Sequence, residues 1–205
     1  MFRTILAGGF ALTLGLVAPL GAQAADTKDA KDPALPLRLS AFAINMGLGP
    51  RMSAGMVDIV IERWSTEDET NRLVETLSSQ GSGALLSAVQ SVKPRAGYIR
   101  TPYSVGWDIA FAREEALPNG GRRVIFATDR PMSFGERYSA GRSTTYEFMV
   151  GEVHFEAAGR GQGTLIAAAK LRLKKDKKTL EIENLDSLPV RLNEVAVLTE
   201  PGCKN

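Results

Sequence analysis

Three carboxylates share one strand phase and are the residues best suited to acid–base chemistry. Asp58 and Glu62 alternate with the apolar residues of one β-rich run, and Asp108 takes the equivalent phase of another. If the two strands are neighbours and this face lines a cavity, the acids make a pair of the kind that glycosidases use. The same alternation predicts instead that all three lie on a solvated outer face, opposite the core.

Aromatic residues gather between residues 98 and 111 and give a candidate ligand site. Ligand pockets are mostly apolar, with a few polar groups that fix orientation. The candidate ligand-binding residues are therefore Tyr98, Arg100, Tyr103, Trp107, Asp108 and Phe111. Aromatic side chains on strands also commonly pack in the core, so a core role is the alternative.

A basic segment suggests a second surface, one for anionic envelope components such as lipid head groups or cell-wall polymers. It consists of Lys170, Arg172, Lys174, Lys175, Lys177 and Lys178. The alternative is a solvated hairpin tip whose lysines discourage pairing between strand edges. The formal net charge of the whole chain is only +2, which gives no reason to expect a nucleic-acid partner.

The remaining reactive residues are few. The chain holds one histidine, His154, and one cysteine, Cys203. These numbers leave no set of ligands for a typical zinc or copper site, and we expect no metal and no cofactor. His154 lies in an apolar strand and faces outward if Val153 and Phe155 face inward. The sequence has none of the common nucleophile, phosphate-loop or dinucleotide motifs, and the glycines at 159, 161 and 163 predict a hairpin turn.

The first 24 residues have the pattern of an export signal. Arg3 precedes an apolar stretch, and Ala22-Gln23-Ala24 is a small-x-small cleavage pattern. We therefore expect an exported, periplasmic or secreted protein whose mature form has no transmembrane span. Residues 25–36 read as a flexible lead-in, 37–198 as a single β-rich domain, and 199–205 as a flexible tail in which Cys203 lies.

Period-two alternation dominates the domain and predicts strands. The runs at 37–48 and 55–64 come first, and several more with short turns follow residue 98. Residues 66–92 have helical spacing after a Thr66/Glu69 capping box, and predict two short helices or one broken helix. In the run 164–173, Leu165, Ala167, Ala169, Leu171 and Leu173 are expected to share one face, and a bulge or bend is expected near Gly151.

Short turns between successive strands indicate an antiparallel meander. We predict a mainly β domain in which this meander forms a curved sheet or barrel, with the two-helix insertion at 66–92. A two-sheet sandwich is the alternative. The expected function is an exported, non-enzymatic binding or interaction module for an unknown ligand, with a small apolar molecule as one candidate. The alternatives are a hydrolase of envelope or extracellular polymers that uses Asp58, Glu62 or Asp108, and an assembly component.

Overall fold

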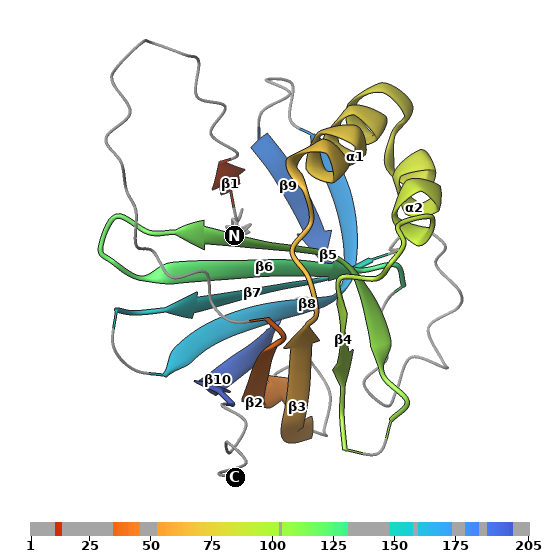
Figure 1. The fold of residues 1–205 in the computed structure, drawn as a ribbon. Coiled ribbons are helices and arrows are strands. Elements are labelled where there is room, and N and C mark those ends of the chain that lie inside the picture. Colours follow the sequence, from red (N-terminus) through yellow and green to blue (C-terminus); the bar gives the residue numbers. More distant parts are fainter. Residues whose placement is uncertain are drawn as a thin grey trace, which may run out of the picture.

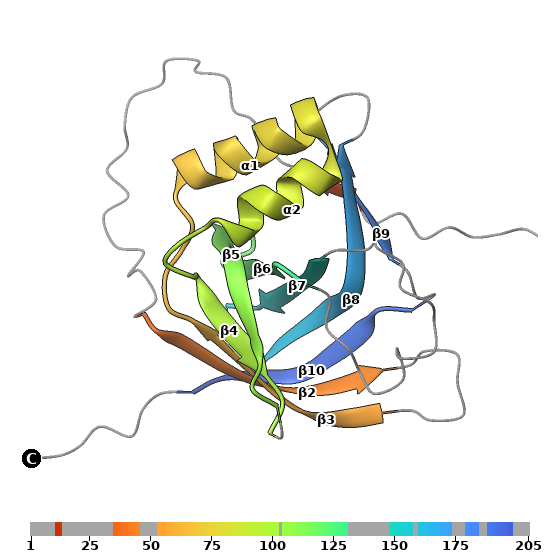
Figure 2. The same cartoon turned by 90° about the vertical axis from the view of Figure 1, so that its right-hand side faces the viewer.

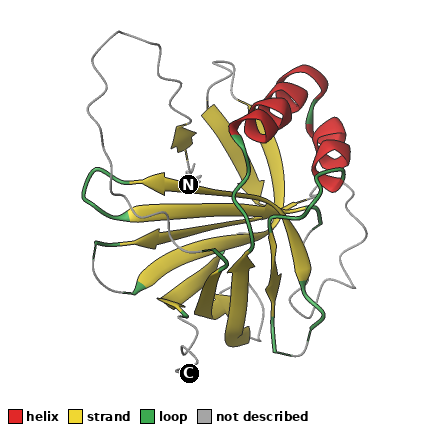
Figure 3. Cartoon of the chain, in the orientation of Figure 1, coloured by secondary structure: helices red, strands yellow, loops and turns green. Residues whose placement is uncertain are grey.

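The structure is a computed structural model, which describes residues 11–13, 35–45, 53–102, 104–130, 148–157, 160–173, 179–184 and 188–198 of the 205. Strands make up most of it, with two adjacent helices (Figure 3). In chain order the elements are β1 (Ala11–Thr13), β2 (Leu37–Asn45), β3 (Ser53–Ile61), α1 (Glu67–Gln80), α2 (Ser82–Gln90), β4 (Gly97–Arg100), β5 (Trp107–Ala116), β6 (Arg122–Thr128), β7 (Phe148–Phe155), β8 (Gly161–Leu173), β9 (Thr179–Asn184) and β10 (Val190–Val197).

Eight of these strands close into an antiparallel barrel (Figure 1). Strands β2 to β8 follow one another as a meander, and β10 pairs with both β8 and β2 to complete the ring. Closure leaves no unpaired edge in the ring. The predicted barrel is therefore confirmed, and the two-sheet sandwich is not what the chain forms.

Two described strands, β9 and β1, lie outside the barrel ring, and β9 is attached to the long strand β8. The first half of β8, to Leu165, pairs with β10, whereas the second half, from Ala169 to Leu173, pairs with β9. The far edge of β9 pairs with the three residues of β1, which lie within the predicted leader. Barrel closure does not depend on β1, because β1 contacts β9 and no strand of the ring.

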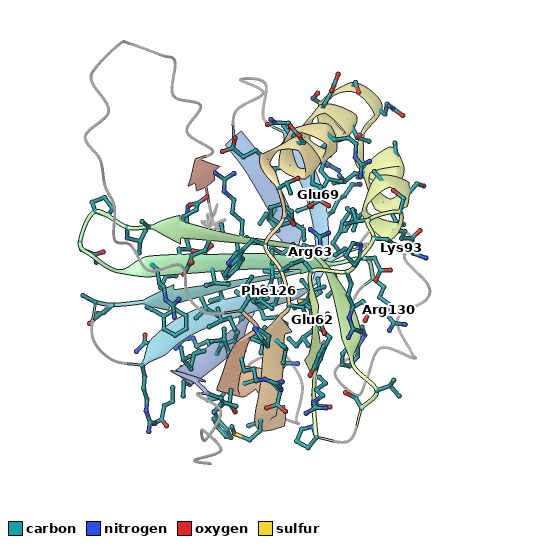
Figure 4. All side chains as sticks on the ribbon, in the orientation of Figure 1. Glu62, Arg63, Glu69, Lys93, Phe126 and Arg130 are labelled. Atoms are coloured by element: carbon teal, nitrogen blue, oxygen red, sulfur yellow. The ribbon has the colours of Figure 1, made fainter. Side chains whose placement is uncertain are left out.

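Alternation positions the barrel core as the sequence predicts. In β3, Val57, Ile59 and Ile61 are buried, and Asp58 lies on the opposite face. The same strand pairs along its full length with β2, from Leu37 opposite Ile61 to Asn45 opposite Ser53. Inward residues of all eight strands meet in one cluster that includes fully buried Phe126 in the middle of the barrel (Figure 4).

The predicted insertion forms two helices. Thr66 caps α1, and the side chain of Glu69 accepts a hydrogen bond from the Thr66 backbone N–H, which completes the capping box. The helices part at Gly81, whose φ of 82° lies where residues with a side chain rarely go. Figure 2 shows both helices lying across the strands between β4–β5 on one side and β8–β9 on the other. Among the described residues, neither helix has the length and apolar character needed to span a bilayer.

The helices rest on a second apolar cluster, which changes the prediction for the face of residues 164–173. Leu73, Leu77, Leu85 and Val89 pack against outward residues of β5, β7 and β8. In β8 the pairing with β7 slips between Ile166 and Ala169, so that two residues of β8 oppose one of β7. The single apolar face predicted for 164–173 is therefore wrong. Leu165 points into the barrel, while Ala169 and Leu171 face the helices.

Of the two glycine predictions, one is confirmed and one is corrected. The bulge expected near Gly151 is present: the pairing of β7 with β8 is irregular between Phe148 and Val150, next to Gly151, while the pairing with β6 runs through Gly151 without interruption. Gly161 and Gly163 belong to β8 rather than to a turn. A side chain at Gly163 would meet the carbonyl oxygen of Glu152 at 2.3 Å, so close approach of the two strands explains the glycine.

Candidate functional site

The three carboxylates of the acid–base hypothesis lie on the outer face of β3, β4 and β5, or just beyond it, and each meets an arginine. Asp58 lies 3.4 Å from Nε of Arg100. Glu62 and Asp108 both bind Arg95, at 3.0 Å to Nε and 2.7 Å to Nη1 respectively. The structure therefore gathers the acids into a surface ion-pair network, as the solvated-face interpretation expects.

Tyr98 is the centre of this network. The guanidinium carbons of Arg95 and Arg100 lie 5.1 and 5.7 Å from the centroid of its ring, which is within the range of cation–π contacts. The hydrogen bonds that Arg95 donates to Glu62 and then to Asp108 hold the pKa of Arg95 above its ordinary value. Of the predicted ligand-binding residues, the structure thus brings together Tyr98, Arg100 and Asp108.

The other predicted ligand-binding residues have different surroundings. Trp107 packs against the barrel core, and Phe111 packs in the cluster beneath the helices. Phe111 leaves the phase of Ile109 because the pairing of β5 with β6 slips between these two residues. Tyr103 lies outside the described residues. Trp107 and Phe111 therefore do not join Tyr98 on the outer face.

His154 is exposed on the outer face of β7, the orientation expected when Val153 and Phe155 face inward. Its Nε2 contacts the carboxylate of Glu152, which is largely buried and lies 3.8 Å from Nη1 of Arg123. Arg123 in turn pairs with Glu115. Within the described part of the chain, no group of three or more histidine, cysteine or acidic residues is placed to hold a metal ion.

The structure describes only part of the basic segment. Lys170 and Arg172 lie on β8 opposite Glu183 and Glu181 of β9. Lys174, Lys175, Lys177 and Lys178 fall outside the described residues, and so does Cys203.

A groove that the sequence analysis did not single out lies on the outer face of β10, β2 and β3. Its volume is about 510 Å³, within the roughly 300–1,000 Å³ of small-molecule sites. Phe42 of β2 lies at its middle, opposite Met56 of β3 on one side and Asn193 of β10 on the other. The full lining is Ser40, Phe42, Met56, Arg160, Asn193, Glu194, Ala196 and Leu198.

Large apolar side chains in the lining of the groove are exposed to solvent. Phe42, Met56 and Leu198 are 42%, 45% and 48% exposed. Solvent-facing outer positions of an antiparallel sheet are ordinarily polar, as they are around Arg95 and around Arg123 in this barrel. The phase of Phe42 and Met56 was readable in the sequence, because Phe42 falls between inward Ala41 and Ala43 and Met56 precedes inward Val57. Their proximity to Arg160 and Glu194 was not.

Two charged residues, Arg160 and Glu194, form part of the groove lining. Nη1 of Arg160, just before β8, lies 2.7 Å from Oε2 of Glu194 on β10. Ser40 and Asn193 add neutral polar groups to the lining. An apolar surface with a few converging polar groups is the usual composition of a site for a small organic molecule.

Comparison of the chain with protein-family models, with characterised proteins and with solved structures finds no match. Fold and surface therefore have to define the class of protein. It is an eight-stranded antiparallel β-barrel with a two-helix insertion and an apolar groove on its outer face.

Proposed function

We propose that this protein is an exported, non-enzymatic binding module that holds a small apolar ligand in the groove formed by β10, β2 and β3. The observation that carries the proposal is the exposure of Phe42, Met56 and Leu198 together in one groove. Leaving large apolar side chains in contact with water forgoes roughly 25 cal/mol for each Å² that could be buried.

The barrel interior is a weaker candidate for the ligand. Eight-stranded barrels are just wide enough to be filled by side chains or to hold one small ligand. Here Phe126, Met149, Leu165 and Leu192 are fully buried in the middle of the barrel. The groove, in contrast, is open to solvent and needs no rearrangement of the core. Export rests on the leader pattern of residues 1–24.

The test is titration of the purified protein with the neutral fluorescent probe N-phenyl-1-naphthylamine. We expect saturable binding that weakens about tenfold in Phe42→Ser and in Met56→Ser, because a tenfold change corresponds to roughly 1.4 kcal/mol of lost apolar contact. Val105→Ser is the matched control. Val105 is fully exposed and lies outside the groove, so the same loss of apolar surface there should leave binding unchanged.

Circular dichroism should show that all three variants keep the fold, since each change is at an exposed position. Absence of saturable binding, or equal binding by the Phe42→Ser, Met56→Ser and Val105→Ser proteins, would contradict the proposed function.

A further inference from the structure

The ion pair between Arg160 and Glu194 in the groove is exposed, so a ligand can take the place of one partner. Arg160 and Glu194 are 67% and 73% exposed, and they share one contact, from Nη1 to Oε2. Exposed pairs of this kind contribute at most about 1 kcal/mol to stability. A ligand that replaces one partner therefore displaces little binding energy.

Arg160 keeps donors available for such a ligand. A guanidinium carries several N–H groups in a planar fork that matches the two oxygens of a carboxylate. Among the described residues, the hydrogen bond to Glu194 is the polar contact that the Arg160 side chain makes. A free carboxylate can thus bind this arginine in the two-pronged geometry that the single contact to Glu194 does not provide.

The backbone of β10 is distorted where it supplies this pair. Pairing with β2 slips between Asn193 and Ala196, and pairing with β8 slips between Leu192 and Val195. Glu194, within this bulge, has a φ of 50°, which is uncommon for a residue with a side chain. Bulges redirect side chains, and strained residues gather at ligand sites. This bulge puts the Glu194 carboxylate beside Arg160 within the groove lining.

We propose that the ligand is an amphiphile with an aliphatic chain and a carboxylate head. The head binds Arg160 in place of Glu194, and the chain lies along Phe42, Met56 and Leu198. This inference rests on the proposed function, because it specifies the chemical class of the ligand for the same groove.

The experiment is calorimetric titration of the full-length protein with decanoate, decanol and decylamine, each below its micelle concentration, at neutral pH and low salt. Decanoate should bind at least tenfold more tightly than decanol. Arg160→Gln should bring decanoate down to the affinity of decanol and leave decanol unchanged. Glu194→Gln should strengthen decanoate binding severalfold, because the competing carboxylate is gone.

Arg191→Gln is the matched control. Like Arg160→Gln, it removes one positive charge, but from an exposed residue of β10, the strand of Glu194, that does not line the groove. Its decanoate affinity should stay within twofold of the unchanged protein. An equal loss in Arg160→Gln and Arg191→Gln would mean that general charge attraction, rather than a site at Arg160, governs binding, and would overturn the inference.

The remaining outcomes separate the two proposals. Equal affinity for decanoate and decanol, unaffected by Arg160→Gln, would overturn the carboxylate head and leave the apolar groove supported. Tighter binding of decylamine than of decanoate, if Glu194→Gln abolishes it, would overturn the carboxylate head and indicate a cationic head instead. Binding of none of the three compounds would contradict the proposed function itself.

Discussion

Gly151 of β7 lies directly opposite Phe126 of β6, with no side chain between the glycine backbone and the aromatic ring. A Cβ at Gly151 would lie 2.2 Å from Cζ of Phe126 and within 2.7 Å of two more ring atoms. Phe126 is fully buried, so its ring has little freedom to move away. The absence of a side chain at 151 therefore makes room for the largest residue at the centre of the barrel.

Gly151→Ala should accordingly lower the free energy of unfolding by about 1–3 kcal/mol, the usual cost of overpacking a core. Chemical denaturation measures it. The control is Gly55→Ala on β3, where an added Cβ meets nothing within 4 Å and the change should be within about 0.5 kcal/mol. Adding Phe126→Leu to Gly151→Ala should recover part of the loss. Equal stability of the two alanine variants would contradict this packing.

Arg63 forms hydrogen bonds with residues at both ends of the helical insertion, and we expect these bonds to make the stability of the fold depend on pH. Its guanidinium donates to both carboxylate oxygens of Glu69, at 2.9 and 3.0 Å (Figure 4). It also donates to the carbonyl oxygen of Pro94, beyond α2. The hydrogen bond from Arg63, aided by that from the Thr66 backbone, lowers the pKa of Glu69 below its ordinary 4.5. A lowered pKa means that ionised Glu69 stabilises the folded state at neutral pH. This contribution is lost as the pH falls through the pKa of the folded state.

Glu69→Gln isolates this charge, because glutamine can still complete the capping box. At pH 7 the free energy of unfolding of the variant should be about 1 kcal/mol lower than that of the unchanged protein. The difference should shrink toward zero as the pH falls below 4.5. Denaturation of both proteins across this pH range checks the prediction. A difference that stays constant would show that the charge on Glu69 plays no part.

Replacing Glu194 by glycine should relieve the backbone strain at this position and raise the free energy of unfolding relative to replacement by alanine. A left-handed backbone costs a residue with a side chain roughly 1–2 kcal/mol that glycine does not bear. Glu194→Gly and Glu194→Ala both lose the bond to Arg160, but only alanine keeps the strain at φ 50°. The glycine variant should therefore be about 1 kcal/mol more stable than the alanine variant in thermal or chemical unfolding. The reverse order would contradict a strained Glu194.

The ion pairs around Arg95 should matter little for stability. Arg95, Glu62 and Asp108 are 43%, 38% and 60% exposed, so water and salt screen their attraction. Arg95→Met keeps the aliphatic stem near Tyr98 and should cost less than about 1 kcal/mol. Raising the salt concentration should narrow even that difference. A loss of several kcal/mol would assign the network a structural role that its exposure does not predict.

The sequence predicted the barrel because its alternation is local. Val57, Ile59 and Ile61 show which face of β3 is buried without knowledge of any partner strand. The reversal in β8 between Leu165 and Ala169 could not be predicted in this way. Both halves of that run are apolar on the same phase, and it is packing of Leu73 and Leu77 from α1 that gives the second half a separate cluster.

The candidate site was less accessible to sequence reasoning for a similar reason. Phe42 and Met56 stand at outward positions, which is a usable local signal. Their neighbours Arg160 and Glu194 come from segments more than 100 residues further along, and the bulge in β10 that places Glu194 depends on pairing with two strands. The sequence directed attention to residues 98–111 instead, because aromatic density is visible without a fold.

The measurement that tests the ligand groove most directly is photolabelling with an aliphatic diazirine probe, followed by mapping of the labelled residues by mass spectrometry. Labels should fall on Phe42, Met56 and Leu198, and an excess of decanoate should remove them. Labels confined to the helix-covered cluster around Phe111 and Leu171, or spread over the surface and unaffected by decanoate, would contradict the account.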